Sequence, residues 1–361
     1  MDAAATGTAL RLPPSYGSGH LAEIGLTTAY TYDVSLTIIA YATREDPESL
    51  SRARTLADTL IQLQASDPAQ DGRLRGGYEP VPWDEDGEVI PVMSSSDTGN
   101  LAWAGLALLR VHAVTHEPQY LQAATRLGEW IVNNTWDDRG SGGFTGGRDG
   151  DDQPIEWKSI EHNLDAYALF TQLAEYTGEG TWTQAADHAR DLLDSLWDPD
   201  AEHFWIGTTS DGETINTEDY VPQDGQSWSW LALRDPEYAA ALDWVSDNLA
   251  VSDGKLSGVK VADQDDPTSA IWLEGTAQFA TALICRNYSG DYQQALDYLE
   301  TLRLAQTQAP GADGKGIVAA SQDGTAGGDN TIYSSTHTGT TSWFIFAATG
   351  TNPLSTANCS T

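Results

Sequence analysis

"WKSIEHNLDAYALF", residues 157–170, joins a polar cluster directly to an apolar run. Glu161, His162 and Asn163 supply a carboxylate, an imidazole and an amide, and small or apolar side chains follow Asp165 on nearly every side. A helix that is apolar almost all round is buried. The stretch therefore predicts a buried helix whose first turn is polar, and its meaning depends on whether the pattern recurs.

The same pattern occurs six times along the chain. The segments are "TYDVSLTIIAYA", "DTGNLAWAGLALL", "IEHNLDAYALF", "QDGQSWSWLAL", "WLEGTAQFATALI" and "THTGTTSWFIFAA". Aligned on one position of the polar cluster, they lie 49 to 67 residues apart, at Asp33, Asn100, Asn163, Gln226, Gly275 and Gly339. A repeat at such a period indicates an array of similar supersecondary units.

A second, amphipathic helix is predicted behind five of these runs. Its apolar residues recur every three or four positions with charged residues between them, in residues 47–64, 118–134, 181–197, 236–250 and 292–306. This spacing predicts one buried face and one wet face. Gly- and Asp-rich segments such as "QDGRLRGG" and "SDGKLSG" follow and predict short hairpins or tight loops.

Buried helices alternating with amphipathic ones predict an all-α fold, an (α/α)6 barrel or toroid of six helical hairpins with short β-hairpin loops. A single hairpin cannot bury its inner face alone, and ring closure removes that problem; an open helical solenoid is the alternative. The sixth outer helix is not obvious, and residues 17–30 or the tail after residue 350 are candidates for it. We expect an N-terminal extension (1–27), a catalytic barrel (28–350) and a C-terminal tail (351–361).

The charge of the chain is extreme, with 53 acidic against 18 basic residues and a net charge of −35. The acids are scattered, so the surface should repel nucleic acid and anionic membranes. Such a surface suits high salt, where screening is strong, and a halophilic source is the prediction, with an acidic secreted enzyme as the alternative. No apolar run approaches the ~18 residues needed to span a bilayer. The N-terminus lacks the pattern of a signal peptide, so the compartment is left open, with secretion or a high-salt environment suspected.

The two cysteines do not predict a disulfide framework, since Cys285 lies in an apolar helical run and Cys359 in the tail. The chain carries no phosphate-binding loop, dinucleotide fingerprint or zinc-ligand spacing. We therefore expect no cofactor and no metal, and a monomer by default.

Carboxylates near the starts of the buried helices are the candidate catalytic groups: Glu161, Glu274, Asp33 and Asp224. A closed toroid gathers these helix ends around one concavity, the usual place for a site. Glu274 follows "IWL", and an apolar setting should raise its pKa, as a general acid requires. The alternative for the aspartates, including Asp97, is helix capping.

Aromatic, amide and imidazole side chains near the same ends are the candidate substrate-binding residues. They are Tyr32, Asn100, Trp157, His162, Asn163, Trp205, Gln226, Trp228, Trp272 and His337. Flat indole faces suit stacking on sugar rings, although tryptophans also fix loops. The two histidines are equally compatible with a structural role.

The segments "WKSIEHNLDAYALF", "IWLEGTAQ" and "TYDVSLTIIAY" resemble the six-hairpin glycosidase superfamily and its N-acylglucosamine 2-epimerase relatives. The resemblance covers roughly residues 28–348. It implies an (α/α)6 barrel that acts on carbohydrate, with acidic residues at the mouths of the inner helices.

The leading functional prediction is a glycoside hydrolase that cleaves a poly- or oligosaccharide by carboxylate general acid/base catalysis. Inversion is the favoured mode, because carboxyls on different hairpins across a wide mouth leave room for a water, whereas a gap of about 5 Å between the carboxyls would indicate retention. A sugar epimerase or isomerase that uses His162 and His337 is the first alternative. A class II-type terpene cyclase is the second, because "DQDD" supplies Asp263, Asp265 and Asp266. A glycan-binding toroid without catalysis is the third.

Overall fold

The computed structural model describes residues 9–44, 46–264, 268–327 and 330–359. The chain divides into two compact units. Unit 1 comprises residues 1–15, 27–195 and 207–214, and unit 2 comprises residues 16–26, 196–206 and 215–361. The predicted domain limits stay a prediction.

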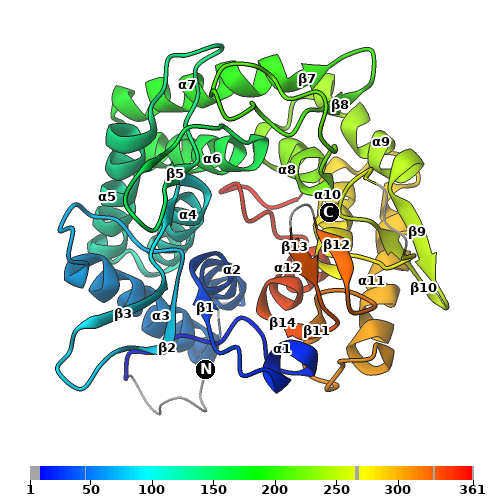
Figure 1. Cartoon of the computed structure of the whole chain (residues 1–361), viewed down its shortest axis with the longest axis horizontal. Coiled ribbons are helices and arrows are strands. Elements are labelled where there is room, and N and C mark those ends of the chain that lie inside the picture. The colour runs from blue at the N-terminus through cyan, green and yellow to red at the C-terminus, as the bar shows by residue number, and fades with distance from the viewer. Residues whose placement is uncertain (1–8, 45, 265–267, 328–329, 360–361) are drawn as a thin grey trace. The chain divides into compact units, whose positions relative to one another are not determined.

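Unit 1 alternates buried and amphipathic helices along the chain. Its helices are α2 (Thr31–Ala42), α3 (Pro47–Ser66), α4 (Thr98–Thr115), α5 (Pro118–Thr135), α6 (Ile160–Thr177) and α7 (Gly180–Leu196). The inner helices α2, α4 and α6 pack side by side in that order (Figure 1). The sequence predicted each of these helices, and their order confirms the repeat within this unit.

Close approach of α4 and α6 depends on a small residue. A Cβ added at Gly105 would lie 2.6 Å from Cδ1 of Leu169. Leu169 and its neighbours on α4, Ala104 and Leu106, are buried. Small residues in the repeated runs therefore let the inner helices pack tightly, and a methyl group at Gly105 would force the two helices apart.

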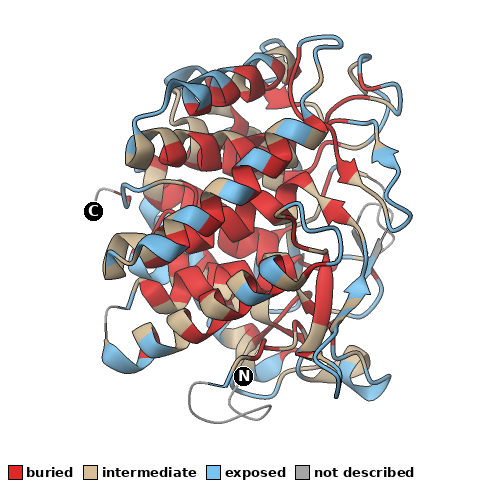
Figure 2. Ribbon diagram, turned by 90° about the vertical axis from the view of Figure 1, so that its left-hand side faces the viewer, coloured by how far each residue is buried: buried red, intermediate tan, exposed pale blue. Residues whose placement is uncertain are grey.

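The outer helices show the predicted amphipathic pattern. In α5, Tyr120, Leu127 and Ile131 are buried at helical spacing, and polar residues between them face solvent. The helices on the side that faces the viewer in Figure 2 carry such stripes of buried and exposed residues. The start of α3 is capped by Asp46, whose side chain accepts a 2.9 Å hydrogen bond from the backbone N–H of Ser49.

Two small antiparallel sheets carry the loops of unit 1. The first has the order β1 (Ala29–Tyr30), β2 (Gly77–Trp83), β3 (Val89–Met93). The second has the order β4 (Ser96–Asp97), β5 (Gly147–Arg148), β6 (Pro154–Ile155). Strand β1 runs directly into α2 and β4 into α4, so each sheet fixes the start of an inner helix.

Unit 2 continues the alternation with some departures from prediction. Its helices are α1 (Gly19–Glu23), α8 (Gln223–Leu233), the 3-10 helix η1 (Pro236–Tyr238), α9 (Ala240–Asn248), α10 (Leu273–Arg286), α11 (Asp291–Gln308) and α12 (Thr338–Thr349). The single outer helix predicted over 236–250 is therefore split into η1 and a short α9. Within residues 17–30 the structure forms only the five-residue α1, and the described part of the tail after residue 350 forms no helix.

Four two-stranded antiparallel sheets belong to unit 2. They pair β7 (Trp197–Asp198) with β8 (His203–Phe204), β9 (Ala250–Asp253) with β10 (Leu256–Val259), β11 (Ile317–Val318) with β14 (Thr336–His337), and β12 (Thr325–Gly327) with β13 (Asn330–Ile332). The predicted turn in "SDGKLSG" is confirmed, because Asp253 pairs with Leu256 across Gly254, which has a φ of +61°. Glycine adopts this left-handed backbone without the steric cost of a side chain.

The two cysteines form a disulfide bond, which corrects the sequence prediction. Cys285 near the end of α10 is bonded to Cys359 in the tail, 74 residues later. The tail is further held where Nδ2 of Asn352 donates a 2.8 Å hydrogen bond to the carbonyl of Leu231. No periodic pattern in the tail indicates that it docks against α10, so the pairing could not be predicted.

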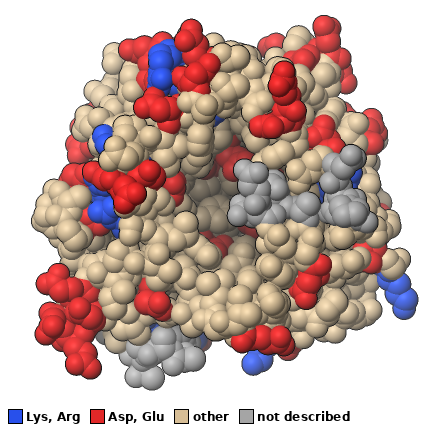
Figure 3. All heavy atoms as spheres, in the orientation of Figure 1, with Lys and Arg blue, Asp and Glu red and all other residues tan. Residues whose placement is uncertain are grey.

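Acidic side chains outnumber basic ones on the face of the molecule drawn in Figure 3. On this face, Asp and Glu are spread over many elements. Within the described residues, no helix combines the length and apolar character needed to cross a bilayer. The halophilic source stays a prediction.

Candidate active site

The first turns of the inner helices in unit 1 gather several candidate residues. Asp33 is buried in the first turn of α2, Asn100 lies in the first turn of α4, and Glu161 and His162 lie in that of α6. Because α4 packs against both α2 and α6, these first turns share one end of the three-helix layer. The alternation read from the sequence therefore brings these candidates of unit 1 to neighbouring helix starts.

Asp97 has a different role from the predicted cap. It occupies the N-cap position of α4, but its side chain makes no capping bond to the helix backbone. Its Oδ2 instead accepts 3.0 Å hydrogen bonds from Oγ of Ser95 and Nδ2 of Asn100. The carboxylate is thus oriented by side chains and is close enough to His162 to act on that group's ionisation.

His162 lies against the start of α4 where a glycine leaves room for it. A Cβ added at Gly99 would lie 2.6 Å from Cδ2 of His162 and 3.1 Å from Oδ2 of Asp165. Asp165 follows His162 by three residues on α6, so the two side chains share a helix face. Gly99 is therefore the residue that lets an imidazole and a carboxylate meet at this point.

The imidazole of His162 is kept neutral by its surroundings. Burial lowers the pKa of His162, and the negative charge of Asp97 opposes that shift only in part. The ring keeps some contact with solvent, whereas its Nδ1 atom is buried and has no hydrogen-bond partner among the described residues. A neutral ring with an unsatisfied nitrogen is suited to accept or donate one proton or hydrogen bond to a ligand.

Aromatic side chains surround this cluster. The ring of Trp157, which is 37% exposed, lies 5.3 Å from that of His162. Tyr32 meets Trp103 edge-on at 5.4 Å. Burial raises the pKa of the Tyr30 hydroxyl, and the negative charge of nearby Asp33 raises it further. Trp157 thus has a face available for stacking, whereas Trp103 belongs to the core.

Unit 2 brings Glu274 and His337 together although 63 residues separate them in the sequence. Oε2 of Glu274, in the first turn of α10, lies 3.4 Å from Nδ1 of His337 at the start of α12. Both side chains are buried, with 8% and 6% of their surface exposed. The ring of Tyr16 stacks on His337 with centroids 4.6 Å apart.

His337 also begins its helix. It is the N-cap of α12, and its Nδ1 accepts a 3.3 Å hydrogen bond from the backbone N–H of Thr340. An N–H group can only donate, so Nδ1 carries a lone pair when the ring is neutral. A carboxylate oxygen beside that lone pair is favourable only when a proton lies on one of the two groups. The pair is therefore a place where a proton can be held between a carboxyl and an imidazole.

The neighbouring helix α8 adds Asp224 and a layer of tryptophans. Asp224 lies in the first turn of α8, which packs against α10, and it is half-buried. Trp228 is buried and stacks on Trp343 at 6.0 Å. Trp272 is the N-cap of α10, and its ring closes over Gly275, where an added Cβ would lie 2.1 Å from Cε3. Trp205 is half-buried and contacts His203 edge-on.

Asn163 and Gln226, at the same position of the repeat, act as ties between a helix and a loop. Oδ1 of Asn163 accepts from the N–H of Phe144 at 2.8 Å, and its Nδ2 donates to the Phe144 carbonyl. Gln226 makes the same pair of bonds to Phe204, at 2.8 and 3.0 Å. Their amide groups are used to hold the loops, which explains why an amide recurs at this position.

Lys158 likewise serves the fold. Its side chain is fully buried, and Nζ donates 2.8 Å hydrogen bonds to the carbonyls of Arg139 and Gly142. Nζ also lies 3.3 Å from a carboxylate oxygen of Asp137. Burial lowers the pKa of Lys158, and Asp137 opposes that shift. The rare lysine beside Glu161 therefore fixes the loop that follows α5.

The aspartates of the "DQDD" motif do not assemble into a described site. Oδ1 of Asp263 accepts a 2.7 Å hydrogen bond from the backbone N–H of Val221. Asp265 and Asp266 lie outside the described residues. Within the part of the chain that the structure describes, no three His, Cys, Asp or Glu side chains are grouped to hold a metal ion.

Several residues of these clusters were missed by sequence reasoning. Ser159, not Glu161, caps α6 by accepting a 3.1 Å hydrogen bond from the N–H of His162. Tyr16 lies far from the repeat in sequence and has no periodic signal that links it to His337. A serine directly before the apolar run of α6 is the signal that would have identified the cap.

Comparison with solved structures supports the predicted architecture. A sugar epimerase from a ruminal bacterium matches 90% of this chain and 88% of its own at a TM-score of 0.67 and 14% identity. A D-mannose isomerase matches 93% and 89% at 0.67 and 13% identity. A glycosidase solved in complex with glucose matches 94% and 91% at 0.65 and 13% identity. The chain has the (α/α)6 barrel fold.

The resemblance stated from the sequence is thus confirmed for the fold. These solved structures include both sugar epimerases and glycosidases, as the resemblance implied. No protein-family model matches the chain, and no curated protein sequence matches it significantly. At such low identity the likeness defines the architecture, and the reaction has to be argued from the residues of this chain.

Proposed function

We propose that this protein is a glycoside hydrolase that acts on a neutral poly- or oligosaccharide. The observation that carries the proposal is the buried pair of Glu274 and His337, 3.4 Å apart, at the start of an inner helix. Glycosidic cleavage requires a protonated carboxyl that delivers its proton to the leaving oxygen. Burial disfavours a charged carboxylate, and the adjacent imidazole provides a source of the proton.

Glu274 is the proposed general acid and Asp224 the first candidate for the base. Both lie in first turns of packed inner helices of unit 2, but Glu274 is buried whereas Asp224 is half-buried. Two carboxyls in different environments can divide the roles of acid and base. The roles predicted for Asp33 and Glu161 stay predictions, and a water-activating base corresponds to inversion.

The charges of unit 1 support a substrate without carboxylates. Asp97 and Asp165 lie near the helix starts beside His162, whose imidazole is kept neutral. A glycan rich in uronic acid would meet like charge at this cluster, which costs binding energy. Neutral sugars avoid that cost, because their hydroxyls can donate hydrogen bonds to carboxylates and their faces can stack on aromatic rings.

The test is a screen for reducing ends released from neutral and anionic polysaccharides, at low and at molar salt. The Glu274→Gln variant keeps the size of the side chain but cannot deliver a carboxyl proton. We expect the parent to release sugar from at least one neutral polysaccharide and the variant to be slower by at least about 100-fold, the range of general acid catalysis. Glu129→Gln, at an exposed position of α5 in unit 1, is the matched control and should behave as the parent. Equal rates for Glu274→Gln and the parent would remove the assignment.

A sugar epimerase or isomerase is the second candidate, and His162 is the observation that favours it. A neutral imidazole with a buried, unpartnered nitrogen can take a proton from a carbon beside a carbonyl. Such a reaction in D₂O places deuterium on the substrate carbon, whereas hydrolysis does not. Proton NMR of mannose and cellobiose incubated with the protein in D₂O therefore separates the two reactions.

A further inference from the structure

A hollow of unit 2 lies at the end of α10 opposite to Glu274. It has a volume of about 700 Å³ and is bounded by α9, the loop between α10 and α11, and the first turns of α11. Arg286 in its wall follows Glu274 by twelve residues on the same helix, a distance of about 18 Å at the helical rise. The hollow is therefore separate from the candidate catalytic carboxyl.

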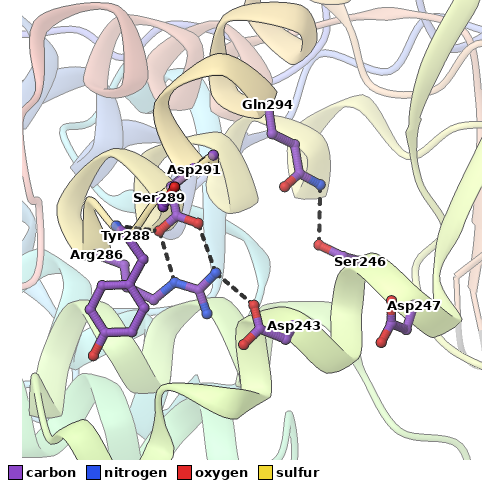
Figure 4. A pocket seen from close by; sticks show the side chains of 9 residues that line it. Asp243, Ser246, Asp247, Arg286, Tyr288, Ser289, Asp291 and Gln294 are labelled. Atoms are coloured by element: carbon purple, nitrogen blue, oxygen red, sulfur yellow. Dashed lines mark hydrogen bonds and ion pairs between the residues drawn. The ribbon is translucent and has the colours of Figure 1, made fainter.

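Hydrogen bonds inside the protein hold Arg286 in place in the wall of this hollow (Figure 4). Its guanidinium donates to both carboxylate oxygens of Asp291 at 2.9 and 2.8 Å and to Oδ1 of Asp243 at 2.7 Å. A further 2.8 Å hydrogen bond goes to the carbonyl of Ala239. Nearly all donors of the guanidinium are thus used inside the protein, so the arginine shapes the wall and is not a free anion site.

Tyr288 lies against Arg286 in a fixed orientation, while its ring stays open to solvent. The side chain is 49% exposed, and the Arg286 guanidinium lies 5.1 Å from its ring centroid. The ring also meets Trp230 edge-on at 6.1 Å, and the backbone N–H of Tyr288 donates to Asp291 at 2.9 Å. An exposed aromatic ring held from behind is a stacking surface that loses little entropy when a ligand binds.

The opposite wall carries polar groups that can form hydrogen bonds with sugar hydroxyls. Ser246 of α9 accepts a 3.1 Å hydrogen bond from Nε2 of Gln294, and both line the hollow. Asp243 and Asp247 expose carboxylates on the same wall. Three carboxylates against one arginine leave the hollow negative, so it disfavours an anionic ligand.

A second hollow lies next to the first along α11, and the two share a lining residue. Gln294 also lines a depression of about 480 Å³ with Lys255, Tyr298 and Leu304. From Asp291 to Leu304 the residues of α11 that line the two hollows extend for about 20 Å along the helix. A groove of this length fits an extended chain better than a compact small molecule.

We propose that this groove, with Tyr288 as its stacking surface, is a binding site for a neutral glycan chain outside the active site. The ligand class rests on the proposed carbohydrate function together with the exposed ring, the polar wall and the negative charge. A site of this kind would keep the enzyme on a polymer while the active site acts elsewhere on it. Its contacts are independent of Glu274, so binding and hydrolysis can be tested separately.

The experiment is native affinity electrophoresis through gels that contain laminarin, xylan or glucomannan, with polygalacturonate as the anionic comparison. All variants are made in the Glu274→Gln background, so that the polymer stays intact. We expect at least one neutral polymer to retard the protein, Tyr288→Ala to weaken the apparent affinity by roughly tenfold, and Tyr288→Phe to retain it. A tenfold change corresponds to about 1.4 kcal/mol.

Tyr292→Ala is the matched control, since Tyr292 is 59% exposed nearby but does not line the hollow. Retardation that is insensitive to Tyr288→Ala, equal losses for the two alanine variants, stronger retention on polygalacturonate, or no retardation by any neutral polymer would each overturn the proposal. Retardation that depends on Tyr288 in a protein without hydrolytic activity would support this site while the proposed catalytic function fails. The two proposals are thereby distinguished.

Discussion

Oε2 of Glu274 lies 3.4 Å from Nδ1 of His337, and the ring of Tyr16 covers the face of that imidazole. Three segments of unit 2 far apart in the sequence are thus joined at two helix starts. The imidazole has two roles, since it caps α12 and also pairs with the carboxyl. A substitution that separates the two roles is the informative one.

His337→Asn makes that separation. Asparagine is among the best N-cap residues, so we expect the melting temperature to stay within a few degrees of the parent. The imidazole beside Glu274 is lost, and we expect the rate of hydrolysis to fall by at least about 100-fold. Calorimetry and reducing-end assays on the same preparation check both halves, and unchanged activity would limit His337 to a capping role.

Gly99 is predicted to control the position of His162. In Gly99→Ala the new Cβ would lie 2.6 Å from Cδ2 of His162, so the ring has to move. We expect a loss of stability of about 1–3 kcal/mol, the usual result of overpacking, and a larger loss of activity than stability alone explains. Gly180→Ala is the control, because an added Cβ there meets nothing within 4 Å. Denaturant melts and initial rates measure the two effects, and wild-type rates in Gly99→Ala would count against a role for His162.

The lowered pKa of His162 predicts a pH dependence of stability. The unfolded chain has an ordinary histidine pKa near 6.5, and burial makes the folded value lower. Between the two values the unfolded state binds more protons, so the free energy of unfolding falls as the pH drops below about 6.5. His188 and His203 act in the same direction, because burial lowers their pKa values too.

Urea denaturation at pH 7.5 and 5.5 isolates the contribution of His162. We expect His162→Gln to lose less stability between the two pH values than the parent does. His116→Asn is the control, because His116 is exposed at the end of α4 with a φ of +59°, a conformation that asparagine tolerates. Identical pH dependence in His162→Gln and the parent would contradict the prediction.

The Cys285–Cys359 disulfide is predicted to stabilise the folded chain. It closes a loop of 74 residues, for which the chain-entropy model gives about 4 kcal/mol. We expect the double variant Cys285→Ser, Cys359→Ser to unfold at lower denaturant than the oxidised parent, and reduction of the parent to have a similar effect. Two free thiols per chain, counted after denaturation under non-reducing conditions, would show that the bond does not form.

The repeat made most of the fold predictable, whereas contacts between distant segments were not. An apolar run such as 160–170 fixes a buried helix by its own composition, and amphipathic spacing fixes α3, α5 and α7. The region 236–250 has a helical pattern too, but Asp235 and Pro236 support a separate turn, where Asp235 accepts a 3.1 Å hydrogen bond from the N–H of Glu237. Local pattern does not show where a helix breaks inside an apolar stretch.

The candidate site was predictable in part, for a related reason. Glu274 and His337 were identified because each stands at the start of a buried run, yet only the packing of α10 against α12 pairs them. Asn163 and Gln226 recur at one position of the repeat, which is equally expected of a substrate contact and of a structural tie. The hydrogen bonds to Phe144 and Phe204 show that both amides tie loops to helices. No pattern in a single sequence distinguishes that role from a substrate contact.

The most direct test of the central claim, that Glu274 delivers the proton to the leaving oxygen, compares leaving groups. The measurement is the hydrolysis rate of a 2,4-dinitrophenyl glycoside of the sugar released in the polysaccharide screen, relative to the rate on the polysaccharide itself. A leaving group of low pKa departs without protonation, so Glu274→Gln should approach the parent on the activated glycoside while remaining at least about 100-fold slower on the polymer. Equal impairment of Glu274→Gln on both substrates would contradict the assignment of Glu274 as the acid.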